Sequence, residues 1–458
     1  MKVIICGAGR VGSGIARHLA AENNDITVID LDPVLVQRLQ ENLDVRGIVG
    51  HGAHPDILQR AGAVDADMLI AVTQSDETNM IATQVAHSLF TVPRKIARVR
   101  SQAYLAAEWQ KMFSHDHMPI DVIISPEREV GKAVLRRLRV PGAFETVDFA
   151  NGKVQMVGVR IQPGSPVSNT PLEQLRETFP GRRFTVMAIS RSGRFFVPAQ
   201  SDPIEEGDDV YFVAPREEVE ATLRLFGHEE QEAHRVIIVG GGNIGVHVAK
   251  GLEKRHRAKV KLIERSKHRA EQAADELGRT VVLLGSGLDE AILKEASVEE
   301  TETVVTLTND DEVNILTSLM ARKLGAKRTI TLVNERGYGD LINSLEIGAF
   351  IDPRATTVST ILQYVRRGRI KGLHSIGSGA GEVIEAEALQ TSELVDKPLG
   401  ETKLSPGIVI GIIVRGNEIF APDRDFIVRN GDQVVVFATR EMVRKAEQMF
   451  RVSLEFFS

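Results

Sequence analysis

The stretch Val3-Ile-Ile-Cys-Gly-Ala-Gly-Arg-Val-Gly12 decides the fold of this chain. An apolar run passes directly into the glycine pattern Gly7-x-Gly9-x-x-Gly12, which is typical of a strand that leads into a helix beside a dinucleotide. The first glycine permits a tight turn, the second lets the backbone approach a pyrophosphate, and the third lets the helix pack on the strand. A phosphate is then expected at the helix N-terminus, where free N–H groups and the helix dipole favour an anion.

The same stretch returns as Val236-Ile-Ile-Val-Gly-Gly-Gly-Asn-Ile-Gly245. The repetition continues further along the chain: residues 72–79 resemble 307–314, residues 135–142 resemble 365–372, and residues 206–214 resemble 430–438. The 458 residues are therefore two copies of one module. They meet at the charged, apolar-poor segment 228–234, which we interpret as a linker.

The first part of each module alternates short apolar runs with amphipathic stretches such as Asp76–Phe90, which has the spacing of a helix. This alternation predicts a parallel, doubly wound sheet of the Rossmann-like α/β class in each half. The predicted strands are 2–6, 26–30, 45–49, 67–72, 95–99 and 121–124, and then 235–239, 259–263, 280–284, 303–307, 328–333 and 349–351.

The second part of each module has a different sequence pattern, which predicts strands of alternating polarity joined by Gly/Pro turns and followed by one terminal helix. We expect a small α+β domain there. The predicted order is a Rossmann-like nucleotide-binding domain (1–140), a small domain (141–228), a second Rossmann-like domain (233–370) and a second small domain (371–458).

An acidic residue ends the second predicted strand of each half, Asp30 in the first and Glu264 in the second. Both follow their glycine motif by about 20 residues, the spacing of the carboxylate that binds the ribose hydroxyls. Because a carboxylate repels a 2′-phosphate, NAD is favoured over NADP. The alternative is a glycine turn with no ligand.

Three further segments are expected at the carboxyl ends of the strands, where ligands of such sheets bind. The segment 50–53 follows strand three and matches 285–288, while Thr73 and Gln74 follow strand four and match Thr308 and Asn309. Asp76 and Asp311 are candidate N-caps for the next helix, with Ser75 or Asp310 able to share that role.

Arg98 is expected on strand five, where its side chain could neutralise phosphate or form a salt bridge at the sheet edge. The second half has Leu332 at the equivalent position, which suggests that the two sites differ in affinity or ligand.

The composition is that of a globular protein, with 43% hydrophobic and 26% charged residues. The net charge of −6 argues against a nucleic-acid partner, and no apolar run reaches the length of about 18 residues that spans a bilayer. Cys6 is the one cysteine, so no intrachain disulfide can form and a reducing cytoplasm fits best. Since structure is expected from the first residues, no signal peptide is predicted.

Catalytic groups are sparse. The companion domains are small for a substrate domain and carry no constellation of His, Lys and Asp. His115-Asp-His117 is better interpreted as a polar turn than as a metal site, and Cys6 as a buried apolar side chain. The basic segments 136–139 and 366–371 indicate favourable charge at a solvated helix C-terminus, or a docking site for an acidic partner or anionic membrane.

Taken together, these strings resemble the TrkA family, the regulatory subunits of bacterial Trk potassium-uptake systems, which are built from tandem RCK N- and C-domains. The resemblance covers the whole chain. It is carried by residues 5–12, 22–30, 50–55, 66–79, 96–100 and 239–245. At the position after the first glycine of segment 50–53, many RCK modules have Asp, whereas this chain has His51 and, in the repeat, Ser286.

The resemblance implies a regulatory subunit that is not an enzyme and that binds NAD(H), with ATP or ADP as further ligands in some members. Such proteins form a homo-oligomeric ring, with a tetramer as one option, on the cytoplasmic face of the membrane beneath an integral potassium-translocating subunit. Nucleotide binding changes the shape of the ring and so gates transport. Two alternatives remain, an NAD-dependent oxidoreductase and an interaction protein with vestigial glycine motifs.

The resemblance also implies the residues of two nucleotide sites. The first would use Gly7, Ala8, Gly9, Arg10, Val11, Gly12, Asp30, Gly52, Ala53, Thr73, Gln74 and Arg98, and the second would use Gly240, Gly241, Gly242, Asn243, Ile244, Gly245, Glu264, Ser286, Gly287, Thr308 and Asn309. No metal ligand is expected.

Overall fold

The computed structural model describes residues 1–21, 24–114, 116–179, 181–229, 233–335, 337–338, 347–365, 370–402 and 404–450. Residues 230–232 of the predicted linker, His115, and residues 366–369 of the second basic segment lie outside this set. Contacts divide the chain into two compact units, each built from both halves of the sequence. The first, which we call the α/β unit, comprises Met1–Leu135 and His234–Val365, and the second, the antiparallel unit, comprises Arg136–Ala233 and Arg366–Ser458.

The first sheet of the α/β unit has six parallel strands in the order β3-β2-β1-β4-β5-β6. This is the strand order of dinucleotide-binding folds, in which the direction of winding reverses beside β1. The strands are β1 (Lys2–Cys6), β2 (Asp25–Asp30), β3 (Arg46–Val49), β4 (Met68–Ala71), β5 (Arg94–Arg98) and β6 (Val122–Ile124), and the helices are α1 (Arg10–Ala21), α2 (Pro33–Asn42), α3 (Pro55–Arg60), α4 (Asp76–Phe90) and α5 (Pro126–Arg139).

The second sheet repeats this topology as β16-β15-β14-β17-β18-β19, again with parallel pairing. Its strands are β14 (Arg235–Val239), β15 (Lys259–Glu264), β16 (Val281–Leu284), β17 (Thr303–Thr306), β18 (Arg328–Leu332) and β19 (Ala349–Ile351), and its helices are α8 (Asn243–Glu253), α9 (Lys267–Glu276), α10 (Glu290–Glu295), α11 (Asp311–Lys323) and α13 (Pro353–Val365). The predicted strands and the predicted helix Asp76–Phe90 are confirmed.

Apolar residues on both faces hold each central strand, because helices cover the sheet on two sides. In β1, Val3 and Ile5 join one cluster with α1, whereas Ile4 and Cys6 join another with α3 and α4. This explains why the strand has a continuous apolar sequence rather than an alternating one.

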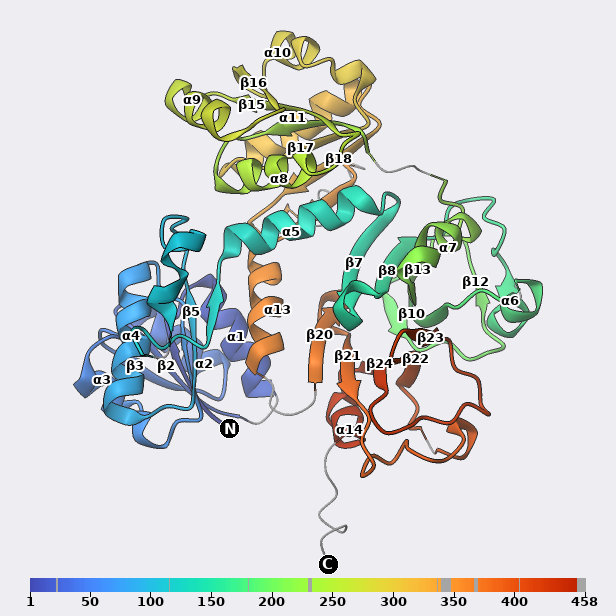
Figure 1. Ribbon diagram of the computed structural model, residues 1–458, viewed down its shortest axis with the longest axis horizontal. Helices are drawn as coiled ribbons and strands as arrows, with labels where there is room; N and C mark the ends of the chain where they lie inside the picture. The colour runs from blue at the N-terminus through green and yellow to red at the C-terminus, as the bar shows by residue number, and fades with distance from the viewer. Residues whose placement is uncertain are drawn as a thin grey trace, which may run out of the picture. The chain divides into compact units, whose positions relative to one another are not determined.

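The last helix of each α/β half packs against the other half, an exchange that the sequence did not predict. Helix α13 of the second half adds Val358 and Ile361 to the core of the first sheet and lies along α1 (Figure 1). A Cβ placed on Gly14 of α1 would lie 2.9 Å from Cγ2 of Val358, so the glycine permits this close contact. Helix α5 of the first half likewise contacts α8, where Gly131 faces His247 and Gly251 faces Leu135.

The antiparallel unit contains two five-stranded sheets with equivalent orders, β7-β8-β13-β10-β11 and β20-β21-β24-β22-β23. Their strands are β7 (Ala143–Phe149), β8 (Val154–Arg160), β10 (Thr185–Arg191), β11 (Arg194–Phe196), β13 (Asp209–Pro215), β20 (Ile370–Ile376), β21 (Gly381–Glu387), β22 (Ile408–Arg415), β23 (Glu418–Phe420) and β24 (Gln433–Thr439). The small pair β9 (Thr170–Pro171) and β12 (Pro203–Ile204) and the helices α6 (Leu172–Thr178), α7 (Val219–Leu225) and α14 (Val443–Gln448) complete it.

The two antiparallel sheets share one apolar cluster, to which Met187 and Val213 contribute from the first half and Ile412 and Phe437 from the second. Polar contacts join them too: the Thr185 hydroxyl donates to the carbonyl of Gly411 at 2.7 Å. The predicted class, two Rossmann-like sheets each followed in sequence by a small α+β domain, is thus confirmed. The four predicted domain boundaries stay predictions.

Candidate functional site

The first glycine loop has the geometry that its pattern predicts. Gly7 has φ +112°, and a Cβ there would lie 3.0 Å from the backbone nitrogen of Thr73, so only glycine fits the turn. A Cβ on Gly12 would lie 1.8 Å from the carbonyl oxygen of Gly7, which shows how closely α1 approaches the loop. A Cβ on Gly9 would meet nothing within 4 Å, so the backbone between these two constraints is open to a ligand.

The second loop repeats each of these features. Gly240 also has φ +112°. A Cβ on Gly245 would lie 1.9 Å from the carbonyl oxygen of Gly240, and a Cβ on Gly242 would meet nothing within 4 Å. Two independent stretches of sequence thus build the same cradle at the N-terminus of a helix, a place suited to an anion.

The two predicted ribose carboxylates hold their glycine loops in place. Asp30 accepts from the backbone N–H of Ala8 at 2.6 Å and of Asp32 at 2.9 Å. Glu264 does the same with Gly241 at 2.7 Å and Ser266 at 2.8 Å. Asp30 is half-buried and lines the cavity described below, whereas Glu264 is only 8% exposed and does not.

In the loop after the third strand of each sheet, the first strand packs so closely that only glycine fits, at Gly52 in the first half and Gly287 in the second. A Cβ on Gly52 would lie 2.9 Å from Cβ of Cys6, and one on Gly287 would lie 2.5 Å from Cγ1 of Val239. Cys6 is fully buried, and desolvation raises the pKa of its thiol to about 12. The interpretation of Cys6 as a small apolar side chain is therefore confirmed.

After the fourth strand, an asparagine that the sequence analysis gave no role fixes the loop. The Oδ1 of Asn79 accepts from the N–H of Thr73 at 2.8 Å and from its hydroxyl at 2.7 Å, and its Nδ2 donates to the carbonyl of Arg98 at 2.9 Å. Asn314 makes the same bonds with Thr308 and Leu332. The one signal in the sequence was the recurrence of Asn at equivalent positions of the repeat.

Of the four candidate N-caps, Ser75 and Asp310 are confirmed, whereas the prediction for Asp76 and Asp311 is wrong. The N-caps are Ser75 and Asp310, whose side chains accept from Thr78 and Val313. The Asp76 carboxylate turns instead to the end of β5 and accepts from the N–H groups of Arg100 and Ser101. The buried carboxylate of Asp76 is stabilised more by hydrogen bonds from these backbone donors, which would otherwise be unpaired, than by a helix N-terminus that Ser75 already caps.

Arg98 ends β5, which lies inside the sheet next to β6, so the predicted salt bridge at a sheet edge is wrong. Its guanidinium donates to the carbonyl of Thr73, while its Nε is buried with no hydrogen-bond partner among the described residues. Desolvation, and then the nearby charge of Arg100, lowers the pKa of Arg98. A cation left unsatisfied in this way fits an anionic ligand.

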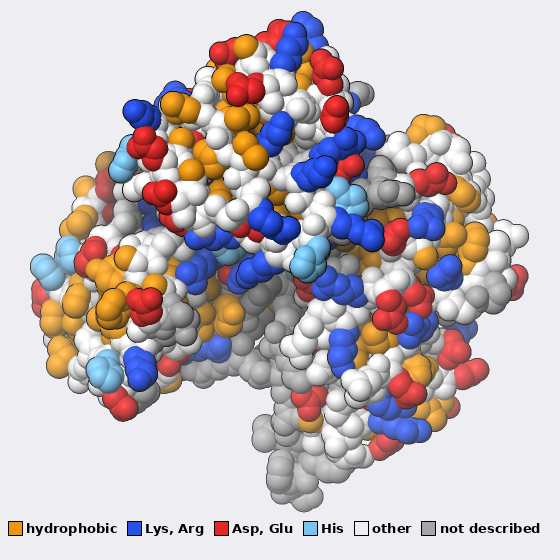
Figure 2. All heavy atoms as spheres, turned by 45° about the horizontal axis from the view of Figure 1, so that its top comes forward, with side chains coloured by type: hydrophobic (Ala, Val, Ile, Leu, Met, Phe, Trp, Pro, Cys, Tyr) orange, Lys and Arg blue, Asp and Glu red, His pale blue; other side chains and the backbone are white. Residues whose placement is uncertain are grey.

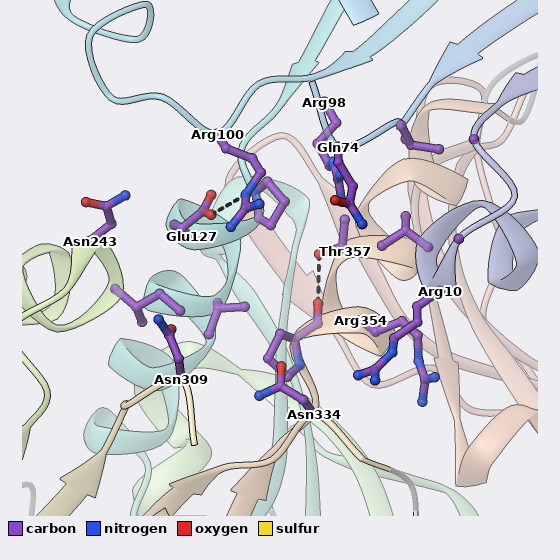
Figure 3. Close-up of a pocket in the computed structure, with 18 of the residues that line it drawn as sticks. Arg10, Gln74, Arg98, Arg100, Glu127, Asn243, Asn309, Asn334, Arg354 and Thr357 are labelled. Carbon is purple, nitrogen blue, oxygen red and sulfur yellow. Dashed lines mark hydrogen bonds and ion pairs between the residues drawn. The ribbon is translucent and has the colours of Figure 1, made fainter. Parts of the chain in front are cut away.

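These loops open onto one cavity of about 2270 Å³ in the α/β unit, shown in close-up in Figure 3. Fifteen of the predicted site residues line it: Gly7, Ala8, Gly9, Arg10, Val11, Asp30, Gly52, Thr73, Gln74, Arg98, Gly241, Gly242, Asn243, Ile244 and Asn309. The others are not part of its lining: Gly12, Ala53, Gly240, Gly245, Glu264, Ser286, Gly287 and Thr308. For Gly12, Gly245 and Gly287 the contacts above indicate a packing role.

The lining of the cavity also includes residues that were not among the predicted site residues, and several of them are charged. Arg100 pairs with Glu127 at the start of α5, with 3.0 Å between Nε and Oε1. Arg10 pairs with Glu335 of the second half. Arg354, from the first turn of α13, reaches the cavity as well and contacts Asp352 at 3.4 Å. The close packing of α1 and α13 at Gly14 brings Arg354 there, and the repeat alone does not reveal that exchange.

The other polar candidates do not form a second site. Among the described residues, no group of three His, Cys, Asp or Glu side chains could hold a metal ion. In the basic segment at the end of α5, Arg139 is exposed but Arg137 is not, and desolvation lowers the pKa of Arg137 to about 10. The prediction of a solvated face therefore holds for Arg139 and fails for Arg137. Over the face in Figure 2, acidic and basic side chains are interspersed.

Comparisons with known proteins agree with this geometry. The TrkA-N domain family matches residues 3–126 and 236–353, and the TrkA-C domain family matches residues 156–227 and 383–451. The Trk system potassium uptake protein TrkA of Azorhizobium caulinodans is 54% identical over 458 residues, which cover all of both chains. That of Halomonas elongata is 43% identical, again over the full length of both.

Solved structures share the fold at lower identity. The RCK domain of GsuK has a TM-score of 0.59 at 17% identity, covering 98% of this chain and 94% of its own. The GsuK channel bound to NAD has a TM-score of 0.60 at 17% identity, and the match covers 98% of this chain and 78% of the GsuK chain. No helix among the residues described is long and apolar enough to cross a membrane.

Proposed function

The chain belongs to the TrkA family, and from this premise we propose that it is the nucleotide-binding regulatory subunit of a Trk-type potassium uptake system. Its relatives named for potassium uptake match it from end to end. The two matched TrkA-N regions contain the two glycine loops, so a regulatory ligand would bind where the structure leaves backbone open.

The observation that carries the proposal is that the first glycine loop is open at Gly9 and that the Arg98 guanidinium, which lines the same cavity, has an Nε without a hydrogen-bond partner in the described part of the chain. The space at Gly9 admits a phosphate to the N-terminus of α1, and the buried Nε of Arg98 has no partner in the described part of the chain. Asp30 lines the same cavity and keeps lone pairs for ribose hydroxyls. We therefore propose NAD(H), or ATP or ADP, as the ligand, held by the site residues predicted above.

The fold suggests how such a ligand would act on the rest of the assembly. A nucleotide in the cavity would connect the first glycine loop with α13, which belongs to the second half but packs on the first sheet. Its binding shifts the conformation only insofar as its affinity differs between states. We propose that a homo-oligomeric ring transmits this shift to an integral-membrane potassium-translocating partner on the cytoplasmic face.

We favour a regulatory over an enzymatic role because two basic side chains that line the cavity are held in ion pairs, Arg10 with Glu335 and Arg100 with Glu127. The alternative, an NAD-dependent oxidoreductase, predicts a substrate-dependent change in NADH absorbance across metabolite panels. Our proposal predicts none.

The direct test is an equilibrium titration of the purified full-length protein with NADH and with ATP. Wild type should show saturable binding, and Gly9→Asp should lose it at the first site while keeping its melting temperature, since a side chain fits at Gly9 without a clash. Gly242→Asp is the matched control for the second site. No saturable binding of either nucleotide to wild type would overturn the proposal.

A further inference from the structure

The second parallel sheet differs in charge from the first at its amino edge, by which we mean the edge where the strands begin. Helices that connect parallel strands run back along the sheet, so they end at this same edge. The glycine loops follow their first strands and therefore lie at the opposite, carboxyl edge. In the second half, the amino edge is formed by the starts of β15, β16 and β18 and by the ends of α8 and α11 (Figure 1).

Two acidic positions at the amino edge of the first sheet are basic in the second. The second strand begins at Asp25 in the first half and at Lys259 in the second, in the same register with the first strand. Two residues before the third strand, the first half has Asp44 and the second has Arg279. Because β15 and β16 are neighbours in the sheet, both reversals of charge lie in one part of the edge.

Two helix ends at this edge also have additional basic residues. Helix α1 ends at Ala21, whereas Lys254 occupies the equivalent position after the last residue of α8. The last turn of α11 contains Lys323 where α4 has Ser88. A cation near a helix C-terminus is favourable in itself because of the helix dipole. The dipole does not act on the two residues near the strand starts, so it explains only part of the basic excess.

Contacts between the loops join these places into one surface, which we call the basic edge. The guanidinium of Arg279 donates to the carbonyl of Arg255, in the loop after α8, at 3.1 Å. The N–H of Lys327, just before β18, donates to the carbonyl of Thr301, just before β17, at 3.3 Å. We define the basic edge by six exposed side chains, Lys254, Arg257, Lys259, Arg279, Lys323 and Lys327. None of the six lines the cavity described above.

The carboxylates at this edge do not neutralise the six basic side chains. Glu253 and Glu302 accept hydrogen bonds from backbone N–H groups at the starts of neighbouring strands, and Glu300 forms an ion pair with a residue outside the six. Asp275 and Glu299 are exposed there as well. Within the described part of the chain, no ion pair joins a carboxylate to any of the six. The basic edge therefore has a net positive charge that is available to a partner.

We propose that the basic edge binds the surface of a bilayer that contains anionic phospholipids. Lys and Arg side chains near such a surface are attracted by its negative potential, and each of them adds to the binding. The headgroup phosphates supply the negative charge that the carboxylates of this edge do not. The glycine loop of the same sheet stays accessible, because it lies at the opposite edge.

Lipid fits the basic edge better than the cytoplasmic loops of a membrane protein do. Such loops carry an excess of Lys and Arg, so the basic edge would repel them. The net charge of −6 for the whole chain disfavours a nucleic acid. The inference goes beyond the proposed function, because it concerns lipid and not the potassium-translocating subunit.

The test is co-sedimentation of the full-length protein with vesicles of phosphatidylcholine, alone or mixed with an equal amount of phosphatidylglycerol, without nucleotide or any membrane protein. Wild type should bind only the anionic vesicles, and added salt should weaken this binding because it screens the charges. Lys259→Asp combined with Arg279→Asp, which restores the charges of the first half, should weaken binding about 10-fold or more.

The matched control is Arg46→Asp combined with Arg60→Asp. It makes the same change of net charge at exposed positions of the amino edge of the first sheet, and it should bind like wild type. Lys254→Ala combined with Lys323→Ser, which copies the first half, is a second variant in case the double aspartate protein fails to fold. It should also weaken binding, by a smaller factor.

The inference is overturned if wild type does not bind the vesicles, if it binds neutral and anionic vesicles equally, or if the control loses as much binding as the double aspartate variant. Loss of binding only to neutral vesicles that contain the potassium-translocating subunit would mean that the partner is an acidic protein surface, which also overturns it. All of these results leave the proposed function standing, since nucleotide titration tests that function separately.

Discussion

Asn79 holds Thr73 by three hydrogen bonds, two to Oδ1 from the backbone N–H and hydroxyl of Thr73 and one from Nδ2 to its carbonyl at 3.2 Å. Asn79 is fully buried, and its Nδ2 also bonds to Arg98 on the adjacent strand. One side chain therefore fixes the loop after β4 relative to β5. This relationship sets the positions of two residues that line the cavity of the α/β unit.

Asn79→Asp should destabilise the protein by about 2 kcal/mol or more. The carboxylate keeps the acceptor but loses the donor, so the carbonyls of Thr73 and Arg98 are left facing a buried negative charge. Urea unfolding measures the change. Asn42→Asp is the control: Asn42 also donates from Nδ2 to a carbonyl, that of Arg38, but it is exposed at the end of α2, so the loss should be clearly smaller because water can hydrate the groups involved. Equal effects of the two variants would contradict this role.

The glycines of one motif should respond differently to alanine. Gly12→Ala should lower the free energy of unfolding by about 3 kcal/mol or more, because its methyl group would lie 1.8 Å from the carbonyl oxygen of Gly7. Gly9→Ala should have little effect on stability, since the space there is empty. Thermal melts of both variants decide the matter, and a stable Gly12→Ala protein would show that α1 does not approach the loop this closely.

Cys6 should resist alkylation in the folded protein. Its pKa is raised from 9.0 to about 12 by burial, so the folded state retains the thiol proton that the unfolded state releases at about pH 9. The stability that this group contributes is fully present below pH 9 and is lost as the pH rises toward 12. Iodoacetamide at pH 8.5 should label Cys6 rapidly only in denaturant.

The control for Cys6 is Cys6→Val, which copies the equivalent Val239 and should show a smaller loss of stability between pH 9 and pH 12. Rapid labelling of the native wild-type protein would mean that the first strand is not covered on this face.

In the antiparallel unit, two equivalent aspartates should each be important for stability. Asp208 and Asp432 are nearly fully buried and receive two bonds from Arg191 and Arg415. Asp208→Asn should cost about 2 kcal/mol, because the partly buried guanidinium loses its charged acceptor. Asp209→Asn, whose partner Arg160 is largely exposed, is the neighbouring control and should cost less. Chemical denaturation that ranks the two in the opposite order would refute this assignment.

The sequence was sufficient to predict both parallel sheets because their strands are apolar on both faces and each glycine motif occurs where a strand meets a helix. The same reasoning located Gly7, Gly9 and Gly12, because the turn from β1 into α1 restricts the backbone there, although the space at Gly7 is also limited by Thr73 in the loop after β4. It could not predict where α5 and α13 pack. An amphipathic helix shows which of its faces is apolar but not which sheet it covers.

The presence of Arg354 and Glu127 in the lining of the cavity could not be predicted for that reason, since it depends on the exchange of helices. Gly14 and Gly131 were the available signals, because a glycine inside a helix often marks a close helix contact. The sequence could not decide between Asp76 and Ser75 as the cap, because a carboxylate near a helix start can also cap it, and only the tertiary fold brings the donors of Arg100 and Ser101 within reach of Asp76.

We propose that nucleotide binding to this chain controls potassium flux through a membrane partner. The most direct measurement is rubidium or potassium uptake into proteoliposomes that contain the potassium-translocating subunit, with and without this protein, over a titration of ATP and NADH. We predict that flux depends on nucleotide with wild-type protein and that Gly9→Asp abolishes this dependence while the protein still binds the partner. Flux that is the same at every nucleotide concentration, with wild-type protein bound, would contradict the account.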